Sequence, residues 1–103
     1  MSDKSLAALE VLSGKKITLG NFLWSIRECE ELSQVEFAKM LGVSRHYLCD
    51  IENGRRIISP KAAAGFATRL GYSATHFVRL ALQDELNKAG LDFEVEVHDH
   101  QVA

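Results

Sequence analysis

Hydrophobic residues recur along most of this chain at intervals of three and four positions, which is the spacing of one face of an α-helix. Short polar turns separate these runs, and several of the turns contain a glycine or a serine. From this pattern we expect five helices, at about residues 18–31, 33–42, 44–54, 59–70 and 73–88. A further helix is expected at about residues 2–14, with a modest apolar stripe formed by Leu6, Ala8 and Leu9.

The segment 32–56 predicts two short helices joined by a tight turn. Ser33 is a candidate N-cap, and Glu36 follows it at the spacing of a capping box. Gly42 stands where the first helix should end, because glycine adopts a left-handed turn without a steric penalty. Ser44 is placed to cap the second helix. Apolar residues at helical spacing predict a buried inner face made of Phe37, Ala38, Leu41, Leu48 and Ile51.

The order of small, glycine and aliphatic residues in this segment is that of a helix-turn-helix. Two helices that cross steeply must meet at a small residue, and Ala38 supplies it. The outer face of the second helix is then left with Arg45, His46, Tyr47, Cys49 and Asp50. An exposed helix face rich in donors and acceptors suits the major groove of DNA. The spacing alone leaves open a plain helical hairpin with a solvated outer face.

The stretch from Leu19 to Gly71 resembles the Cro/repressor-type helix-turn-helix of the XRE family of transcriptional regulators. It covers about half of the chain, and its residues fall in order through the five predicted helices. They are Leu19-Gly20, Leu23, Ile26-Arg27, Leu32-Ser33-Gln34, Phe37-Ala38, Leu41-Gly42-Val43-Ser44, Leu48, Ile51-Glu52-Asn53-Gly54-Arg55-Arg56, Ser59-Pro60 and Leu70-Gly71. The resemblance implies an all-α, five-helix, repressor-like DNA-binding domain.

This domain is expected to span residues 19–72, with the motif itself at residues 33–53. Residues 1–18 would form the N-terminal helical extension. Residues 73–103 would add the fifth helix and a C-terminal strand to the same compact domain.

The resemblance also implies roles for the exposed residues of the motif. Arg27 is expected to pair with Glu52, which would tie the first helix of the domain to the recognition helix; an exposed Arg27 without a fixed partner is the alternative. Base edges are expected to meet Ser44, Arg45, His46 and Asp50. The DNA backbone is expected to meet Gln34, Tyr47, Asn53, Arg55 and Arg56.

The pattern changes to period two at the end of the chain, which predicts a half-buried β-strand. Apolar residues alternate there with acidic residues and a histidine, and they are Leu91, Phe93, Val95 and Val97. A single strand is not stable without a partner. The partner can be the segment 17–19 or the same strand of a second subunit. We prefer the second solution, which makes these four residues the dimerisation contact.

The charge is unevenly distributed along the 103 residues, of which 47% are hydrophobic. The formal net charge of −2 does not by itself indicate a nucleic-acid-binding protein. Residues 73–103, however, carry six acidic and two basic side chains, so the rest of the chain is net positive. This asymmetry is compatible with a DNA-facing part and an acidic part away from phosphate; an ordinary solvated acidic surface is the alternative.

Several other classes of protein are not indicated. No apolar run reaches membrane-spanning length and no signal peptide is visible, so we expect a cytoplasmic protein without a membrane partner. Cys29 and Cys49 are then expected to be free thiols. The residues 98–100 read His-Asp-His but lack a third ligand at matching spacing, so no metal or cofactor is expected. His46 and Cys49 lie one helical turn apart without an evident oxyanion hole or cleft, so no enzyme is expected.

These features predict a sequence-specific transcriptional regulator that binds double-stranded DNA. One recognition helix reads few base pairs, so we expect a homodimer that binds an inverted repeat as an autoregulating repressor. The alternative is an antitoxin of a type II toxin-antitoxin pair, which would bind a toxin protein as well as the operator. Trp24, the N-terminal helix and the acidic tail are the candidate surfaces for a toxin.

Overall fold

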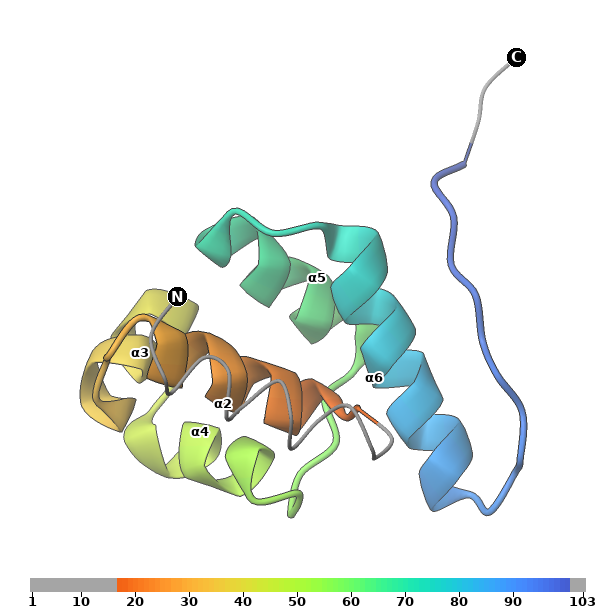
Figure 1. Ribbon diagram of the computed structural model, residues 1–103, viewed down its shortest axis with the longest axis horizontal. Coiled ribbons are helices and arrows are strands. Elements are labelled where there is room, and N and C mark those ends of the chain that lie inside the picture. Colours follow the sequence, from red (N-terminus) through yellow and green to blue (C-terminus); the bar gives the residue numbers. More distant parts are fainter. Residues whose placement is uncertain (1–16, 101–103) are drawn as a thin grey trace. The chain divides into compact units, whose positions relative to one another are not determined.

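The computed structural model describes residues 17–100, and this part of the chain contains five α-helices and no β-strand (Figure 1). The helices are α2 (Leu19–Cys29), α3 (Gln34–Leu41), α4 (Arg45–Glu52), α5 (Pro60–Leu70) and α6 (Ala74–Lys88). The chain forms two compact units, the first reaching to Arg56 and the second beginning at Ile57. The helix predicted over residues 2–14 lies outside the described residues. None of the five described helices has the length and apolar character needed to cross a membrane.

Hydroxyl side chains begin four of these helices, because each accepts a hydrogen bond from a backbone N–H that the helix leaves unpaired. The caps are Thr18, Ser33, Ser44 and Ser59, which accept from the backbone of Asn21, Glu36, Tyr47 and Ala62 at 3.0–3.2 Å. Glu36 completes a capping box on α3 by accepting from the Ser33 backbone at 3.0 Å. This hydrogen bond lowers the pKa of Glu36.

The first unit is a helix-turn-helix with α2 packed against it. Gly42 adopts the left-handed conformation with φ of 75° and ends α3. The Val43 backbone then donates to the Ala38 carbonyl at 3.0 Å, which closes the turn before α4. Helices α3 and α4 pack on each other, and α2 packs on α4. The buried side chains of this unit are Leu19, Leu23, Ile26, Phe37, Ala38, Leu41, Leu48 and Ile51.

At Gly20, α2 approaches the backbone of α4 so closely that a side chain would not fit. A Cβ atom at this position would lie 3.1 Å from the carbonyl carbon of Ile51 and closer still to its oxygen. Both obstructing atoms belong to the backbone, so they cannot move aside as a flexible side chain can. Glycine at this position therefore sets how closely the last turn of α4 lies against α2.

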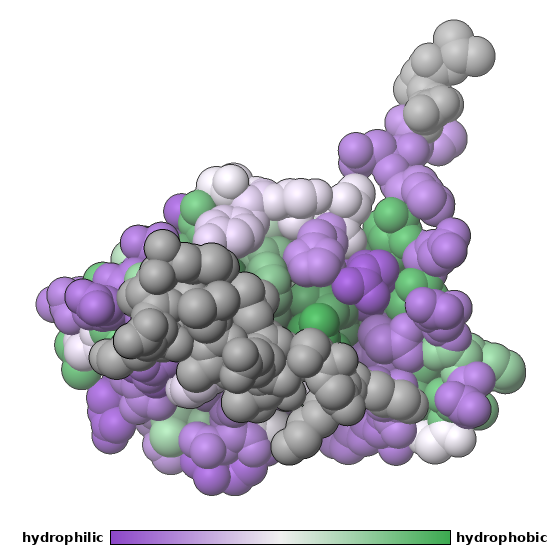
Figure 2. Space-filling model, in the orientation of Figure 1, coloured by the Kyte–Doolittle hydropathy of each residue, from purple (hydrophilic) through white to green (hydrophobic). Residues whose placement is uncertain are grey.

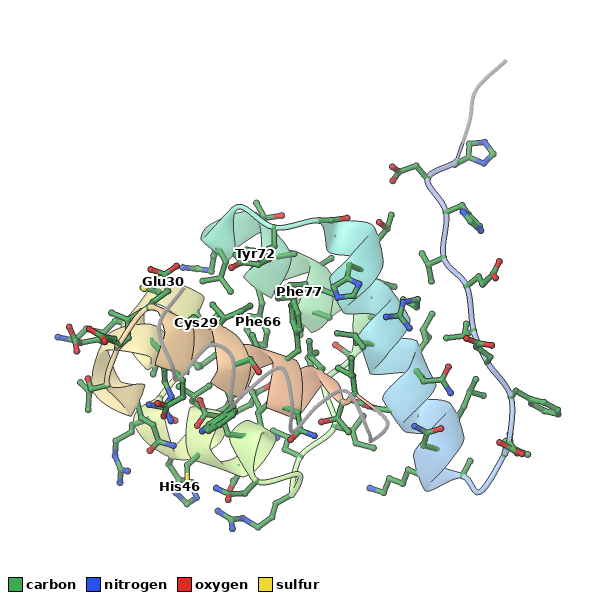
Figure 3. All side chains as sticks on the ribbon, viewed as in Figure 1. Cys29, Glu30, His46, Phe66, Tyr72 and Phe77 are labelled. Carbon is green, nitrogen blue, oxygen red and sulfur yellow. The ribbon has the colours of Figure 1, made fainter. Side chains whose placement is uncertain are left out.

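The second unit is a pair of helices, α5 and α6, that pack on each other. Pro60 at the start of α5 fits because the first turn of a helix needs no N–H from that residue. The rings of Tyr72 and Phe77 lie near each other at a tilt of 53°, with centroids 5.8 Å apart (Figure 3). The buried apolar side chains of this unit are Ile58, Ala63, Phe66, Ala67, Phe77, Leu80 and Ala81.

The predicted strand over residues 91–97 is wrong, because the structure has no strand anywhere in residues 17–100. The alternating pattern does not create a buried face: Phe93 is 64% exposed and Leu91 is also exposed, while Val95 and Val97 are half-buried. The segment after α6 is mostly hydrophilic, with apolar residues interspersed (Figure 2). The fold is therefore all-α in its described part, without the C-terminal strand.

Two features explain why no strand forms. The Gln83 amide of α6 donates to the Phe93 carbonyl at 2.7 Å and accepts from the Val95 backbone N–H at 3.0 Å. This side chain thus takes the backbone hydrogen bonds that a neighbouring strand would have made. The intrachain partner considered from the sequence, residues 17–19, leads directly into α2, since Thr18 is its cap and Leu19 its first residue.

We expect Gly20→Ala to lower the free energy of unfolding, because the added methyl group collides with the α4 backbone. Overpacking of this kind costs about 1–3 kcal/mol. Gly65→Ala in α5 is the matched control, since a Cβ there meets nothing within 4 Å. That control should raise stability by about 0.5–1 kcal/mol, because alanine is the better helix former. Urea unfolding measures both variants, and equal stabilities would contradict the close approach.

We expect Gln83→Ala to release residues 93–95 without unfolding the helices. The Val95 amide proton should exchange faster with solvent, because its hydrogen-bond acceptor is removed. Gln83→Glu still has an oxygen that can accept from Val95, but it loses the N–H group that donates to the Phe93 carbonyl. Hydrogen exchange followed by NMR should therefore show protection of Val95 retained in the glutamate variant. Similar exchange in both variants and wild type would contradict this role of Gln83.

Candidate nucleic-acid interface

Helix α4 carries the candidate interface because its two faces differ sharply. Leu48 and Ile51 are buried, whereas Arg45 and His46 are exposed on the other side. His46 points away from the body of the first unit (Figure 3). The N-terminal turn of α4 therefore offers a cation and an imidazole to solvent, on a helix whose opposite face is fixed by packing.

The structure brings Arg27 and Glu52 together in a bidentate ion pair. Arg27 Nε donates to Glu52 Oε2 at 2.8 Å, and Arg27 Nη2 donates to Glu52 Oε1 at 3.0 Å. The side chains are only 14% and 4% exposed. Arg27 Nη1 also donates to the Leu32 carbonyl at 3.0 Å. The hydrogen bond to Glu52 raises the pKa of Arg27, and the pair joins α2 to the last residue of α4.

Gln34, the first residue of α3, extends this pair to the protein surface. Its Nε2 donates to Glu52 Oε1 at 3.1 Å, and its Oε1 accepts from Arg45 Nη1 at 3.4 Å. A continuous series of polar contacts therefore runs from Arg27 through Glu52 and Gln34 to Arg45. The series ties the first residue of α3 to the first residue of α4, where the interface begins.

A second cluster of contacts joins the end of α4 to the loop that follows it. Arg55 Nε donates to Asp50 Oδ1 at 3.0 Å, which raises the pKa of Arg55. The other Asp50 oxygen lies 3.6 Å from His46 Nε2. Asn53 Nδ2 donates to the Cys49 carbonyl at 2.8 Å, and Cys49 Sγ accepts from Arg55 Nη2 at 3.6 Å. The Asp50 carboxylate is thus engaged by side chains of this chain.

Arg56 is held differently from Arg55. Its guanidinium carbon lies 4.5 Å from the centre of the Tyr47 ring, which is a cation–π contact. Among the described residues no carboxylate forms an ion pair with Arg56. The two neighbouring arginines therefore differ in charge environment, one beside a carboxylate and the other over a neutral ring.

The residues predicted to contact DNA all lie in the first unit, between the start of α3 and the loop after α4. The four predicted dimerisation residues lie in the second unit. The sequence did not reveal the contacts of Asp50 with Arg55 or of Gln34 with Arg45. An acidic and a basic residue five positions apart around a helix end are a weak signal for the first, and no spacing rule indicates the second.

A metal ion needs a set of donor side chains held close together. In residues 17–100, no three histidine, cysteine or acidic side chains come together as a metal site. Cys29 and Cys49 are not joined by a disulfide.

Comparison with known proteins identifies the class. The sequence profile of the family described as Helix-turn-helix matches residues 25–77, which includes the whole α3–turn–α4 unit. The chain belongs to this helix-turn-helix family, of the XRE type that its sequence resembles.

A relative is the ImmF control region 10 kDa protein of Bacillus phage phi105, which is 47% identical over 57 residues. The alignment covers 55% of this chain and 61% of the phage protein, so it spans less than two thirds of that protein's length. No solved structure matches the chain significantly.

We expect Arg27→Ala to destabilise the first unit, because it leaves the nearly buried Glu52 carboxylate without its cation. Removing one partner of a buried pair costs about 3–5 kcal/mol. Glu28→Ala is the control, since Glu28 lies 3.7 Å from Arg27 on the more exposed side and should contribute less than about 1 kcal/mol. Thermal unfolding of both variants measures the difference. An Arg27→Ala protein with unchanged melting would contradict a structural role for the pair.

Proposed function

We propose that this chain is a transcriptional regulator that binds double-stranded DNA by placing α4 in the major groove. The observation that carries the proposal is the exposed polar face of α4, held at a fixed angle by the contacts from Arg27 to Arg45. Membership of the helix-turn-helix family supports it. The name of the phage relative, a control region protein, also supports a regulatory role.

The proposed base-reading residues stand at the start of α4. Ser44, Arg45 and His46 are exposed there and present donors and acceptors of different kinds. Arg45 has a forked guanidinium that can donate twice to guanine, which is the commonest specific contact in the major groove. The residues proposed for the phosphate backbone are Gln34, Tyr47, Asn53 and Arg56.

We further propose that the regulator acts as a homodimer on an inverted repeat. A single α4 covers few base pairs, and a two-fold axis doubles the contact and places the half-sites about 34–36 Å apart. Leu91 and Phe93 are large, apolar and exposed, so they are our candidates for the dimer contact together with Val95 and Val97. These four residues lie in an irregular segment, and the proposed dimer contact requires no strand there. Repression of its own gene is the proposed output.

A mobility-shift titration with DNA from upstream of the chain's own gene tests the function. The wild-type protein should shift this duplex at concentrations at which a scrambled duplex of equal length stays free. Sedimentation of the complex should give two chains per duplex. Equal affinity for both duplexes would contradict sequence-specific regulation, and one chain per duplex would contradict the dimer.

We expect Arg45→Ala and Arg56→Ala to weaken DNA binding in different ways. Arg45→Ala should lose discrimination at one base pair, worth about 1–3 kcal/mol. Arg56→Ala should weaken binding to all sequences alike and reduce the salt slope by about 0.9, because one phosphate contact is lost. Titrations on specific and scrambled duplexes at several salt concentrations separate the two effects.

Lys39→Ala is a charge-matched control for both variants, since Lys39 is an exposed cation of α3 outside the proposed interface. Lys39→Ala should change base-pair discrimination less than Arg45→Ala does. It should also change the salt slope less than Arg56→Ala does. If Arg45→Ala weakened all sequences equally, its assignment as a base reader would be wrong.

A further inference from the structure

We propose that Asp50 is a positioning residue for Arg55, and that the pair contributes base selectivity instead of general attraction to phosphate. The proposal rests on the DNA-binding function proposed above. It changes the roles expected from the sequence, which placed Asp50 on a base edge and Arg55 on the backbone.

Arg55 is held in place by three contacts with the end of α4. Its backbone N–H donates to the Asp50 carbonyl at 2.8 Å, and its Nε donates to Asp50 Oδ1 at 3.0 Å. Its Nη2 lies 3.6 Å from Cys49 Sγ. The side chain is nevertheless 59% exposed. A guanidinium carries five N–H donors in one plane, so the remaining donors point outward in a direction that Asp50 has set.

Asp50 itself is poorly placed to read a base. Its side chain is only 17% exposed, and its Oδ1 already accepts from Arg55. Its Oδ2 faces His46 Nε2 at 3.6 Å. The bond from Arg55 to Oδ1 is charge-assisted and so stronger than a neutral one, and the low exposure of the side chain leaves a cytosine amino group little access to the remaining lone pairs. The geometry therefore favours an Asp50 carboxylate that stays bonded to Arg55 over one that gives up this bond to contact a base.

The charge of the pair separates Arg55 from its neighbour Arg56. The Asp50 carboxylate lies 3.0 Å from Arg55 Nε, so the two opposite charges largely cancel each other's field at distances that are long compared with this separation. Such a pair attracts the phosphate backbone weakly and releases few counterions. Arg56 lies over the Tyr47 ring, and no carboxylate in residues 17–100 forms an ion pair with it. Arg55 is thus suited to a directional contact and Arg56 to general attraction.

A double-mutant cycle tests the positioning role. The probe is the duplex that the wild-type protein selects from a random-sequence pool, measured against a scrambled duplex. We expect Asp50→Ala and Arg55→Ala each to lower the ratio of specific to scrambled affinity by about 5- to 100-fold. In the Arg55→Ala background, Asp50→Ala should change this ratio less than about twofold, because there is no guanidinium left to position. Losses that multiply in the double variant would show that Asp50 reads a base itself.

The salt dependence gives a second readout that a purely structural residue would not change. Arg55→Ala should reduce the slope of log affinity against log salt by much less than the 0.9 or so expected for Arg56→Ala. Asp50→Asn should make the slope steeper, because the amide no longer masks the charge of Arg55. The amide oxygen can still accept from Arg55 Nε, so Asp50→Asn should keep more selectivity than Asp50→Ala.

The outcomes distinguish this inference from the function on which it rests. A wild-type protein that selects no sequence from the pool would overturn the proposed function and the inference with it. A selective wild-type protein, with equal slopes for Arg55→Ala and Arg56→Ala, would overturn the inference alone. Melting temperatures of the five variants check that each is folded at the titration temperature.

Discussion

Glu52 is a carboxylate that is 4% exposed at the end of α4, and such a group is stable only with a cation and further hydrogen bonds around it. Arg27 of α2 supplies the cation and two parallel hydrogen bonds. A buried ion pair adds little net stability over a well-packed apolar pair, but it tolerates few alternative arrangements. The need to satisfy both charges therefore restricts the angle between α2 and α4 more than it strengthens their packing.

Two further features of the first unit depend on this arrangement. Gly20 lets α2 lie against the Ile51 carbonyl, one residue before Glu52, so the charged pair and the closest backbone approach are adjacent. Glu52 Oε1 also accepts from Gln34, whose own oxygen accepts from Arg45. One carboxylate thus neutralises the Arg27 cation and also accepts from Gln34, which in turn contacts the surface cation Arg45.

Much of the fold could be predicted from the sequence because its signals are local. A helix cap is decided within three residues, so Ser33 with Glu36, and Ser59 with Pro60, indicate where α3 and α5 begin. The strand predicted over residues 91–97 was wrong because a strand depends on a partner elsewhere and not on local residues alone. Alternating apolar and acidic residues predict a strand only if a partner strand exists, and here the Gln83 side chain, ten residues from Phe93, takes those hydrogen bonds instead.

The candidate site shows a further limit of prediction from residue types. The sequence indicates that residues 44–56 carry the polar groups of a recognition helix and its following loop. It does not indicate whether Asp50 already has a hydrogen-bond donor within the chain. A carboxylate at that position can accept equally well from a base, from an arginine that binds phosphate or from another neighbouring side chain. The conformation of the loop after α4 brings Arg55 back to the helix, and this is what places the Asp50 carboxylate beside a neighbouring side chain.

This distinction matters for how such a surface would meet DNA. Arg45 and Arg55 both form hydrogen bonds within the chain. A contact with DNA would either replace such a bond or use a donor that the bond leaves free. Replacing one hydrogen bond by another gains only about 0.5–1.5 kcal/mol. The Arg45–Gln34 contact is long at 3.4 Å and neutral on the glutamine side, so it is readily given up. The Arg55–Asp50 bond at 3.0 Å is shorter than the Arg45–Gln34 contact and is charge-assisted, so we propose that it is retained on DNA. Under the proposed function, Arg45 therefore turns toward the base that it meets, whereas Arg55 presents DNA with a donor whose direction is set before binding.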